Sequence, residues 1–245
     1  MVKAKQAEGT VRQVEVEDML NKIRKMLDET RNKRKTALAE LKREEGGDPF
    51  KILIGTILSH RTRDENTTIA TSNLFRRYPT PQDLAKADVS DVKNLIKTVG
   101  FHNTKAKNIV HVAKQIIDEF GGKVPDNIED LMKLKSVGRK TANCVLVYGY
   151  GIPAIPVDTH VHRISNRLGI VKTSKPEETE QELTLKIPRQ YWLEINDLFV
   201  RFGQTICRPV GPKCETCLLK KECIYYKEVF LKQTSRKEID PKHYR

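Results

Sequence analysis

The sequence predicts an all-α protein built from short helices. Apolar residues recur at steps of three and four along most of the chain, as in helices with one buried face. Alternation with a period of two, which would indicate strands, is absent nearly everywhere. Short loops rich in proline and glycine separate the helical segments. These three observations favour a helical fold.

The expected helices follow one another along the whole chain. They cover about 14–45, 50–77 with a turn at 59–64, a helix that begins at Pro81, 104–120, 128–134 and one from about 139 onwards. The polar interval 28–35 would divide the first helix, and the glycines at 46–47 would end it. Thr80 and Pro81 suit an N-cap and a first helical position. Residues 1–13 are polar, and we expect little order there.

Composition limits the function classes. The 245 residues allow one large domain or two small ones, and the net charge of +13 favours a nucleic-acid partner. An anionic membrane surface is the weaker alternative, because no long basic amphipathic anchor is present. The sequence has neither a stretch of about 18 consecutive apolar residues nor an apolar leader, so we expect an intracellular protein.

The five cysteines are distributed unevenly. Cys144 stands alone in an apolar segment, and the other four lie within seventeen residues near the C-terminus. An odd number in an intracellular chain argues against disulfides and for a metal site plus one buried thiol. Four thiolates so close in sequence could hold either zinc or an iron–sulfur cluster.

A helix-hairpin-helix pattern opens the stretch from Ile128 through Gly169. A short amphipathic helix, a tight connection at 134–138 and a new helix opening at Arg139 follow in that order. Such a hairpin exposes backbone N–H groups at a helix N-terminus, which binds phosphate without reading base sequence. A nucleotide-binding P-loop is excluded, since the required glycine before Lys140 and the preceding strand are both missing.

The hairpin and the segment after it resemble the endonuclease III branch of the helix-hairpin-helix DNA glycosylases. Residues 134–142 read Leu-Lys-Ser-Val-Gly-Arg-Lys-Thr-Ala, and residues 157–161 read Val-Asp-Thr-His-Val. The resemblance implies that Lys140 is the nucleophile and Asp158 its essential acidic partner. It also implies an all-α, two-module helix-hairpin-helix glycosylase fold with a C-terminal iron–sulfur cluster loop.

One departure lies inside the hairpin. The family has proline and glycine where this chain has Lys135 and Ser136. Serine tolerates a positive φ poorly, so we expect a strained or altered turn with an extra cation beside the phosphate.

The implied chemistry suits these residue types. A neutral lysine amine can attack the sugar C1′, expel the damaged base and form a Schiff base that permits β-elimination of the 3′ phosphate. Asp158 could stabilise positive charge on the sugar or assist proton transfer. The plainer alternatives are a surface lysine and a helix N-cap aspartate. His160 and His162 lie two residues apart, so we expect packing or DNA-backbone contact there rather than a metal pair.

The cysteine spacing also resembles that family. Cys207, Cys214, Cys217 and Cys223 follow the pattern C-x6-C-x2-C-x5-C, which matches its cluster loop. The resemblance implies a 4Fe-4S cluster, with a structural zinc as the alternative. Arg208 and Lys213 would carry two phosphate-binding cations on this loop, and the two tyrosines at 225–226 would cover the cluster.

The family fills the space left by a flipped base from two loops. By position, Arg61 matches the residue that plugs the gap, often a glutamine, and Phe101 matches an apolar wedge; a core aromatic is the alternative for Phe101. The residues expected to contact DNA are Arg61, Phe101, His102, Lys135, Val137, Gly138, Arg139, Arg208 and Lys213.

The lysine separates this chain from adenine- and thymine-mismatch relatives, which tend to lack it. We therefore expect a bifunctional DNA glycosylase and abasic-site (AP) lyase of base excision repair, acting on oxidised pyrimidines such as thymine glycol in duplex DNA. The alternatives are a monofunctional uracil or thymine-mismatch glycosylase and a non-catalytic helix-hairpin-helix DNA-binding protein. The expected partner is damaged or abasic double-stranded DNA, with no membrane, and the expected state is a monomer.

The expected organisation has four segments. They are an N-terminal helical segment at 1–45 that packs with the cluster module, a six-helix module at 46–152, the cluster module at 153–227 and a tail at 228–245. Lys140 and Asp158 would meet at the cleft between the two modules.

Overall fold

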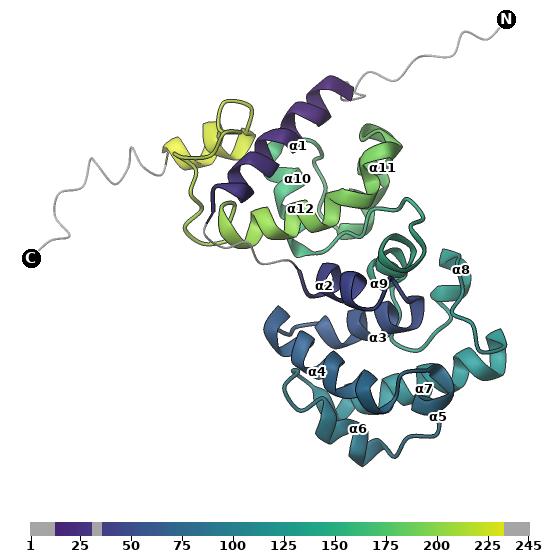
Figure 1. Cartoon of the computed structure of the whole chain (residues 1–245). Helices are drawn as coiled ribbons and strands as arrows, with labels where there is room; N and C mark the ends of the chain where they lie inside the picture. Colours follow the sequence, from purple (N-terminus) through teal and green to yellow (C-terminus); the bar gives the residue numbers. More distant parts are fainter. Residues whose placement is uncertain (1–12, 31–35, 233–245) are drawn as a thin grey trace, which may run out of the picture. The chain divides into compact units, whose positions relative to one another are not determined.

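The computed structural model describes residues 13–30 and 36–232, and every regular element in these ranges is helical (Figure 1). The prediction of an all-α protein is therefore confirmed. These residues form two compact units. The hairpin unit runs from 36 to 156, and the cysteine unit joins 13–30 to 157–232.

The hairpin unit consists of consecutive short helices. They are α2 (Ala37–Glu44), α3 (Pro49–Ser59), α4 (Asp64–Arg77), α5 (Pro81–Ala85), α6 (Val89–Leu95), α7 (His102–Phe120), α8 (Ile128–Leu131), α9 (Arg139–Cys144) and a π-helical continuation of α9, Val145–Tyr150. The stretch 46–152 thus holds more than the six helices expected, because α5 and α8 form separate helices of five and four residues.

Capping residues set several of these helix ends, and the N-cap predicted at Thr80 is confirmed. Thr80 and Asp83 form a complete capping box at the start of α5, with Pro81 in its first turn. Asp48 caps α3 by accepting from two backbone N–H groups. Gly121 ends α7 in the left-handed conformation, at φ 61°.

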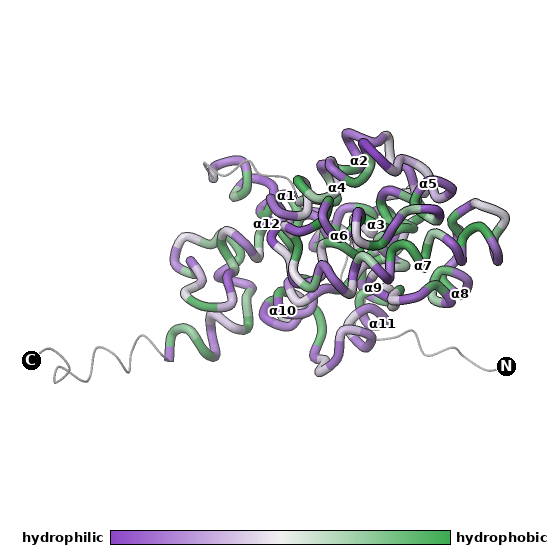
Figure 2. Tube along the Cα trace, turned by 90° about the horizontal axis from the view of Figure 1, so that it is seen from below, coloured by the Kyte–Doolittle hydropathy of each residue, from purple (hydrophilic) through white to green (hydrophobic). Residues whose placement is uncertain are grey.

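The apolar helix α3 forms the centre of the hairpin unit. Its residues from 52 to 58 are all buried, and Figure 2 draws it mostly in the green of hydrophobic residues. A side chain at Gly55 would collide with Leu41 of α2, whose Cδ2 lies 2.4 Å from the Cβ position. Leu38 and Leu41 are therefore part of this core, and α2 belongs to the hairpin unit.

This packing differs from the expected assignment of 1–45 to the cluster module. Only α1 (Gln13–Asp28) joins the cysteine unit, so the division falls before α2. The apolar spacing is similar in α1 and α2, and sequence periodicity does not say which core a helix faces. The predicted break at 28–35 overlaps residues 31–35, which lie outside the described part, as do 1–12 and 233–245.

The cysteine unit is built around α12 (Trp192–Thr205). Helices α1 and α10 (Thr159–Leu168) pack against α12, and α11 (Pro176–Lys186) packs against α10. Its interior includes Phe199 and Phe202 together with Leu20 and Ile23 of α1. The cysteine loop, residues 206–225, follows α12 and leads into a π-helix, Tyr226–Phe230. A 3-10 turn, Arg189–Tyr191, precedes α12.

In the two described ranges, no helix is both long enough and apolar enough to cross a bilayer.

Candidate active site

The hairpin at residues 134–138 connects α8 to α9. Leu134 and Val137 are buried, and the Val137 N–H donates to the Leu134 carbonyl at 3.1 Å. Ser136 between them has φ 62°, in the left-handed region that disfavours a serine. The strain expected from the Ser136 substitution is thus present. The hairpin keeps its fold around Val137, while Lys135, Gly138 and Arg139 are exposed.

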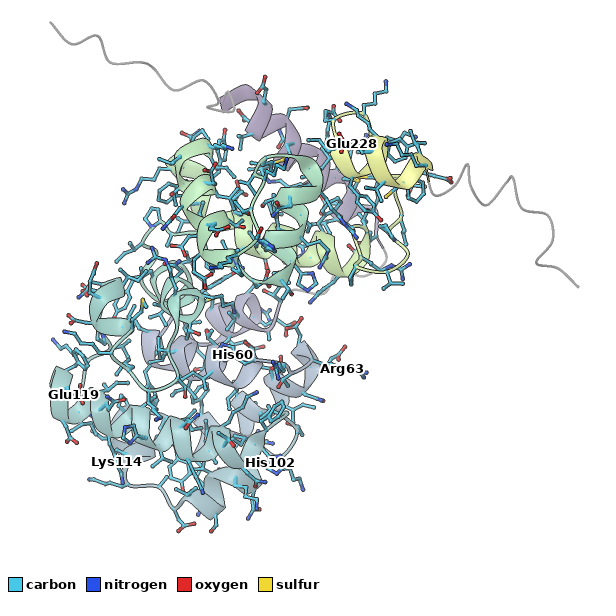
Figure 3. All side chains as sticks on the ribbon, turned by 180° about the vertical axis from the view of Figure 1, so that it is seen from behind. His60, Arg63, His102, Lys114, Glu119 and Glu228 are labelled. Atoms are coloured by element: carbon cyan, nitrogen blue, oxygen red, sulfur yellow. The ribbon has the colours of Figure 1, made fainter. Side chains whose placement is uncertain are left out.

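Lys140 is the second residue of α9 and is partly buried. The next residue, Thr141, is buried, and its Oγ1 lies 3.2 Å from Nε2 of His60. His60 follows the C-terminal end of α3 and is labelled in Figure 3. Burial, together with the positive charges of Lys140 and Lys105, lowers the pKa of His60 to about 4. The imidazole beside the candidate nucleophile is therefore neutral at physiological pH.

Asp158 begins α10 in the cysteine unit as its N-cap. Its Oδ1 accepts from the backbone N–H groups of His160 at 2.9 Å and Val161 at 2.8 Å. Within its own unit this leaves Oδ2 as the carboxylate oxygen that is not committed to the cap. The carboxylate is partly buried. The same side chain thus fits both the N-cap interpretation and a role toward substrate.

Two loops of the hairpin unit carry the predicted gap-filling residues side by side. Arg61 and Phe101 both have positive φ, 52° and 58°, and the Arg61 guanidinium lies 5.9 Å from the centre of the Phe101 ring. The Phe101 side chain is 64% exposed, which excludes the alternative of a core aromatic. His102, the first residue of α7, is partly buried and follows directly. An open hollow is lined by Ile57, His60, Arg61, Phe101, Lys105, Asn108 and Ser136.

Sequence reasoning missed Lys105, which holds the first of these loops. Its side chain is only 6% exposed, and Nζ donates to the carbonyls of Leu58 and His60 at 2.7 and 2.6 Å. Nζ also lies 3.0 Å from Oγ1 of Thr62, which accepts from the N–H of Gly100 at 3.2 Å. Burial lowers the pKa of Lys105 to about 8. A lysine inside an otherwise apolar helix period was the signal for this contact.

All four clustered cysteines line a single cavity in the cysteine unit. The rest of its lining is largely apolar and aromatic and includes Leu168, Phe202, Ile206, Tyr225 and Tyr226. Burial, reinforced by the neighbouring sulfurs, raises the pKa of Cys214 and Cys217 to about 11. Cys144 lies elsewhere, fully buried in the core of the hairpin unit. The sequence correctly separated this thiol from the other four.

Arginine side chains fix the first part of the cysteine loop. Arg167 donates to Sγ of Cys207 at 3.5 Å and to the carbonyls of Arg208 and Pro209 at 2.8 and 3.2 Å, and it stacks over Tyr225. Arg208 donates back to the carbonyl of Gly211 at 2.7 Å. Arg208 and Lys213 are both exposed, as phosphate-binding side chains must be.

The two histidines of α10 take part in separate contacts. Nδ1 of His162 lies 2.7 Å from Oγ1 of Thr179 on α11, and Nδ1 of His160 lies 3.2 Å from the Arg163 guanidinium. Throughout the described ranges, no three histidine, cysteine, aspartate or glutamate side chains converge as a single metal ion would require. These contacts fit the packing role expected of the two histidines, and a contact with the DNA backbone stays a prediction.

The chain is similar to known repair proteins over most of its length. Residues 54–189 match the family model of the HhH-GPD superfamily of base excision DNA repair proteins. Endonuclease III of Thermotoga maritima is 53% identical over 180 residues, which cover 74% of this chain and 84% of the relative. Endonuclease III of Bacillus subtilis is 37% identical, over 72% and 81% of the two chains.

Solved structures agree with the sequence comparison. A trapped endonuclease III–DNA covalent intermediate has a TM-score of 0.75 at 32% identity and covers 89% of this chain and 98% of its own. A thermostable thymine-DNA glycosylase has a TM-score of 0.74 at 27% identity, over 86% and 96%. Overall shape thus does not separate these two activities. The hairpin, the family match and the identity to its relatives together show that the chain belongs to the endonuclease III family within the HhH-GPD superfamily of base excision DNA repair proteins.

Proposed function

We propose that this protein is a base-excision-repair DNA glycosylase with an associated AP lyase activity, in which Lys140 is the nucleophile. The observation that carries the proposal is the position of Lys140. It lies two residues after the hairpin, inside the stretch matched by the family model, and beside a neutral imidazole. One of the similar structures is a trapped covalent intermediate of endonuclease III with DNA.

The reaction follows from the groups at hand. The Lys140 nitrogen forms a bond to C1′ of the flipped nucleotide while the bond from C1′ to the base breaks, and the base leaves with the bonding electrons. Loss of a proton from nitrogen and ring opening give a Schiff base. Removal of a proton from C2′ then expels the 3′ phosphate by β-elimination.

Asp158 assists in this proposal without forming the covalent bond. Its Oδ1 is held by the two N-cap hydrogen bonds, so the carboxylate has a fixed orientation. Oδ2 would then stabilise positive charge as it develops on the sugar, or accept a proton in transit. That Lys140 and Asp158 meet at one cleft stays a prediction.

The proposed partner is double-stranded DNA that carries an oxidised pyrimidine or an abasic site. The net charge of +13 supplies the general attraction to phosphate. Arg61 and Phe101 would fill the space left by the flipped nucleotide, since both project from loops with an exposed ring and guanidinium. The DNA backbone would contact the hairpin at Lys135, Gly138 and Arg139, helix α7 at His102, and the cysteine loop at Arg208 and Lys213. Val137, predicted as a further contact, is buried and donates its N–H to Leu134, so it would support the hairpin from inside. We place the protein inside the cell as a monomer on the DNA.

We further propose that the four clustered cysteines hold a 4Fe-4S cluster. A zinc ion needs four sulfurs about 2.3 Å from one point, whereas a cluster takes one cysteine at each corner of a larger cage. Here all four cysteines line one cavity with mostly apolar and aromatic walls, a lining that suits the larger group. When bound, the cluster would fix the loop that carries Arg208 and Lys213.

Borohydride trapping tests the nucleophile. Reduction during turnover on thymine-glycol duplex should yield a covalent DNA adduct with the wild type and none with Lys140→Ala. Lys133→Ala is the matched control, because Lys133 is an exposed lysine of the same region, paired with Asp130 at 2.6 Å. Normal strand cleavage by Lys140→Ala would exclude the proposed mechanism.

The alternatives make different predictions in the same assay. A monofunctional thymine or uracil glycosylase would release base without a trapped adduct. A non-catalytic DNA-binding protein would release no base and would lose nothing on Asp158→Asn, whereas we expect that variant to lose most base release. A panel of thymine glycol, oxidised cytosine, uracil and mismatched thymine, each opposite both purines, would then define the lesion class.

The cluster has its own test. Anaerobically purified protein should be coloured and contain four irons and four sulfides per chain. Colourless protein with zinc and no iron would support the zinc alternative.

A further inference from the structure

The hairpin of this chain has two backbone features that require support and that proline and glycine would remove. Lys135 has a backbone N–H, which proline lacks, and this N–H needs an acceptor. Ser136 has φ 62°, a conformation that glycine adopts freely and a serine does not. The family resemblance places proline and glycine at these two positions, so something else must stabilise the turn here.

The first need is met by Gln115 of helix α7. The Lys135 N–H donates to Oε1 of Gln115 at 2.8 Å. The amide is also oriented from its other end, because Nε2 of Gln115 donates to Oε1 of Glu119 at 3.2 Å, one turn further along the helix. Glu119 is labelled near the end of α7 in Figure 3. Gln115 thus presents its oxygen, and not its nitrogen, to the hairpin.

The second need is met by Asn108 of the same helix. Its Nδ2 donates to Oγ of Ser136 at 2.8 Å, which fixes the serine side chain while the backbone is left-handed. Asn108 and Gln115 are seven residues apart, or about two helical turns, so they share one face of α7. Each contacts one of the two consecutive residues at which the chain departs from the family hairpin.

We propose that Asn108 and Gln115 are positioning residues that hold the Lys135–Ser136 turn in its DNA-binding shape, in place of the proline and glycine. The inference rests on the proposed function, because the hairpin must bind DNA for its shape to matter. Neither residue needs to touch DNA or the reacting atoms. Their effect passes through the turn to Gly138 and the start of α9.

The rest of α7 supports this role. Phe101 lies immediately before α7, and Lys105 in its first turn fixes the loop of Arg61. One long helix, with a buried face from Lys105 to Ile116, therefore fixes both the gap-filling loop and the hairpin. Two DNA-contacting loops that are attached to one rigid helix keep their relative positions better than two independent loops would.

A double-mutant cycle tests the Asn108 contact. Binding is measured to a duplex with a tetrahydrofuran abasic analogue, which cannot form the Schiff base. Asn108→Ala should raise Kd about three- to tenfold in the wild-type background, the usual scale for one lost hydrogen bond at a strained turn. In a Ser136→Gly background the same change should raise Kd less than about twofold, because glycine needs no support there. Asn108→Leu, of similar size, should behave like Asn108→Ala.

A second cycle tests Gln115. Gln115→Ala should raise Kd in the wild type and in Lys135→Ala, which removes the lysine charge but keeps the backbone N–H. It should have little effect in Lys135→Pro, which has no N–H to satisfy. The comparison of Lys135→Ala with Lys135→Pro separates the backbone hydrogen bond from the phosphate-binding cation.

Two controls accompany these cycles. Thermal unfolding checks that each variant folds. In Asn108→Ala and Gln115→Ala the rate of base release at saturating DNA should stay within about twofold, because the contacts act on binding. Equal losses in both backgrounds would mean that Asn108 or Gln115 contacts DNA directly, and no loss in the wild type would mean that the contacts are idle; either result overturns the proposal. Failure of the wild type to bind the analogue or to be trapped would instead contradict the proposed function.

Discussion

The two units hold their predicted DNA-contacting loops in different ways. In the hairpin unit, side chains of the amphipathic helix α7 bond directly to both loops, through Lys105 on one side and through Asn108 and Gln115 on the other. In the cysteine unit, the loop at 206–225 follows the end of α12, and its four cysteines surround a cavity. Two helices hold this loop at separate points: Arg167 of α10 donates to the carbonyls of Arg208 and Pro209, and Lys22 of α1 pairs with Glu222 at 2.9 Å. The Leu218 N–H also contacts Sδ of Met26 of α1 at 3.2 Å.

This difference predicts that the loops of the hairpin unit keep their shape without a bound group. The cysteine loop, in contrast, should depend on what its four cysteines bind. Left-handed residues at 61, 101 and 136 store strain that only a well-packed scaffold can hold. The cysteine loop carries exposed apolar residues, Val210 and Leu218 among them, and few buried ones, such as Ile206 and Leu219. Changes in the hairpin unit should therefore alter binding by modest factors, whereas loss of a cysteine should disrupt a whole loop.

The largest expected effect is that of Cys217→Ser. Loss of one of four ligands should remove the cluster, and the energy of binding that fixes the loop would be lost with it. We expect visible absorbance and iron content to fall to background and the free energy of unfolding to drop by several kcal/mol. Iron and sulfide analysis with denaturant unfolding measures both.

Cys144→Ala is the matched control for that variant. Cys144 is fully buried, but in the hairpin core. Its loss should cost about 1 kcal/mol as a small cavity while leaving iron content unchanged. If Cys217→Ser retained full iron and stability, the cavity would not be the metal site.

The next largest effect is expected from Lys105→Met. Methionine fills similar space but leaves the Leu58 and His60 carbonyls without their donor, which should cost about 1–3 kcal/mol at pH 7. The difference should depend on pH. Because burial lowers the pKa of Lys105 from 10.5 to about 8, the unfolded chain binds more protons than the native one between these values, and native stability gains as pH rises through that window.

The stability gap between wild type and Lys105→Met should therefore widen from pH 8 to about 10.5. Urea unfolding at several pH values measures it. A gap that narrows over this window would show that hydrogen bonds to the two carbonyls stabilise the protonated form of Lys105 more than burial destabilises it.

A smaller effect, on DNA binding alone, is expected of Gly138→Ala. Gly138 has an ordinary φ of −99°, and an added Cβ would have no heavy atom within 4 Å. Stability should change by less than about 0.5 kcal/mol, while a Cβ facing the phosphate should weaken DNA binding about tenfold. Gly149→Ala is the opposite case, because its Cβ would lie 3.0 Å from Cα of Pro49; it should lower stability. Tight binding by Gly138→Ala would place the phosphate elsewhere.

Sequence patterns predicted the helices well where periodicity and caps agreed. The capping box of Thr80 and the left-handed end at Gly121 are local features, so the residues themselves encode them. The assignment of α2 was wrong because its apolar stripe fits either core, and only contact with Gly55 decides. The resemblance to the family predicted that the four cysteines share one site and that the turn at Ser136 is strained.

The supporting contacts could not be predicted in the same way. Lys105 is 43 residues from Thr62 in sequence, and Gln115 is 20 residues from Lys135. The position of Lys105 on the apolar face of its helix is a local signal of burial, but no local pattern shows which distant carbonyl or N–H such a polar side chain will contact. His60 is similar, as its neighbour Thr141 lies 81 residues away.

The smallest expected effect concerns His60. It tests whether the Lys140 side chain is held in place as firmly as the loops of the hairpin unit. The pKa of His60 is lowered from 6.5 to about 4, first by burial and then by the charges of Lys140 and Lys105. The unfolded chain therefore binds a proton between these values that the native chain does not, so native stability should fall as pH drops from 6.5 to 4.

Lys140→Met removes one positive charge, so the NMR titration midpoint of His60 should rise. It should remain below 6.5, because burial, the larger cause, is unchanged. Lys133→Met should leave the midpoint alone, and His60→Gln identifies the resonance. An unmoved midpoint in Lys140→Met would mean that the ammonium does not lie near the imidazole, and the nucleophile would then be less ordered than the loops around it.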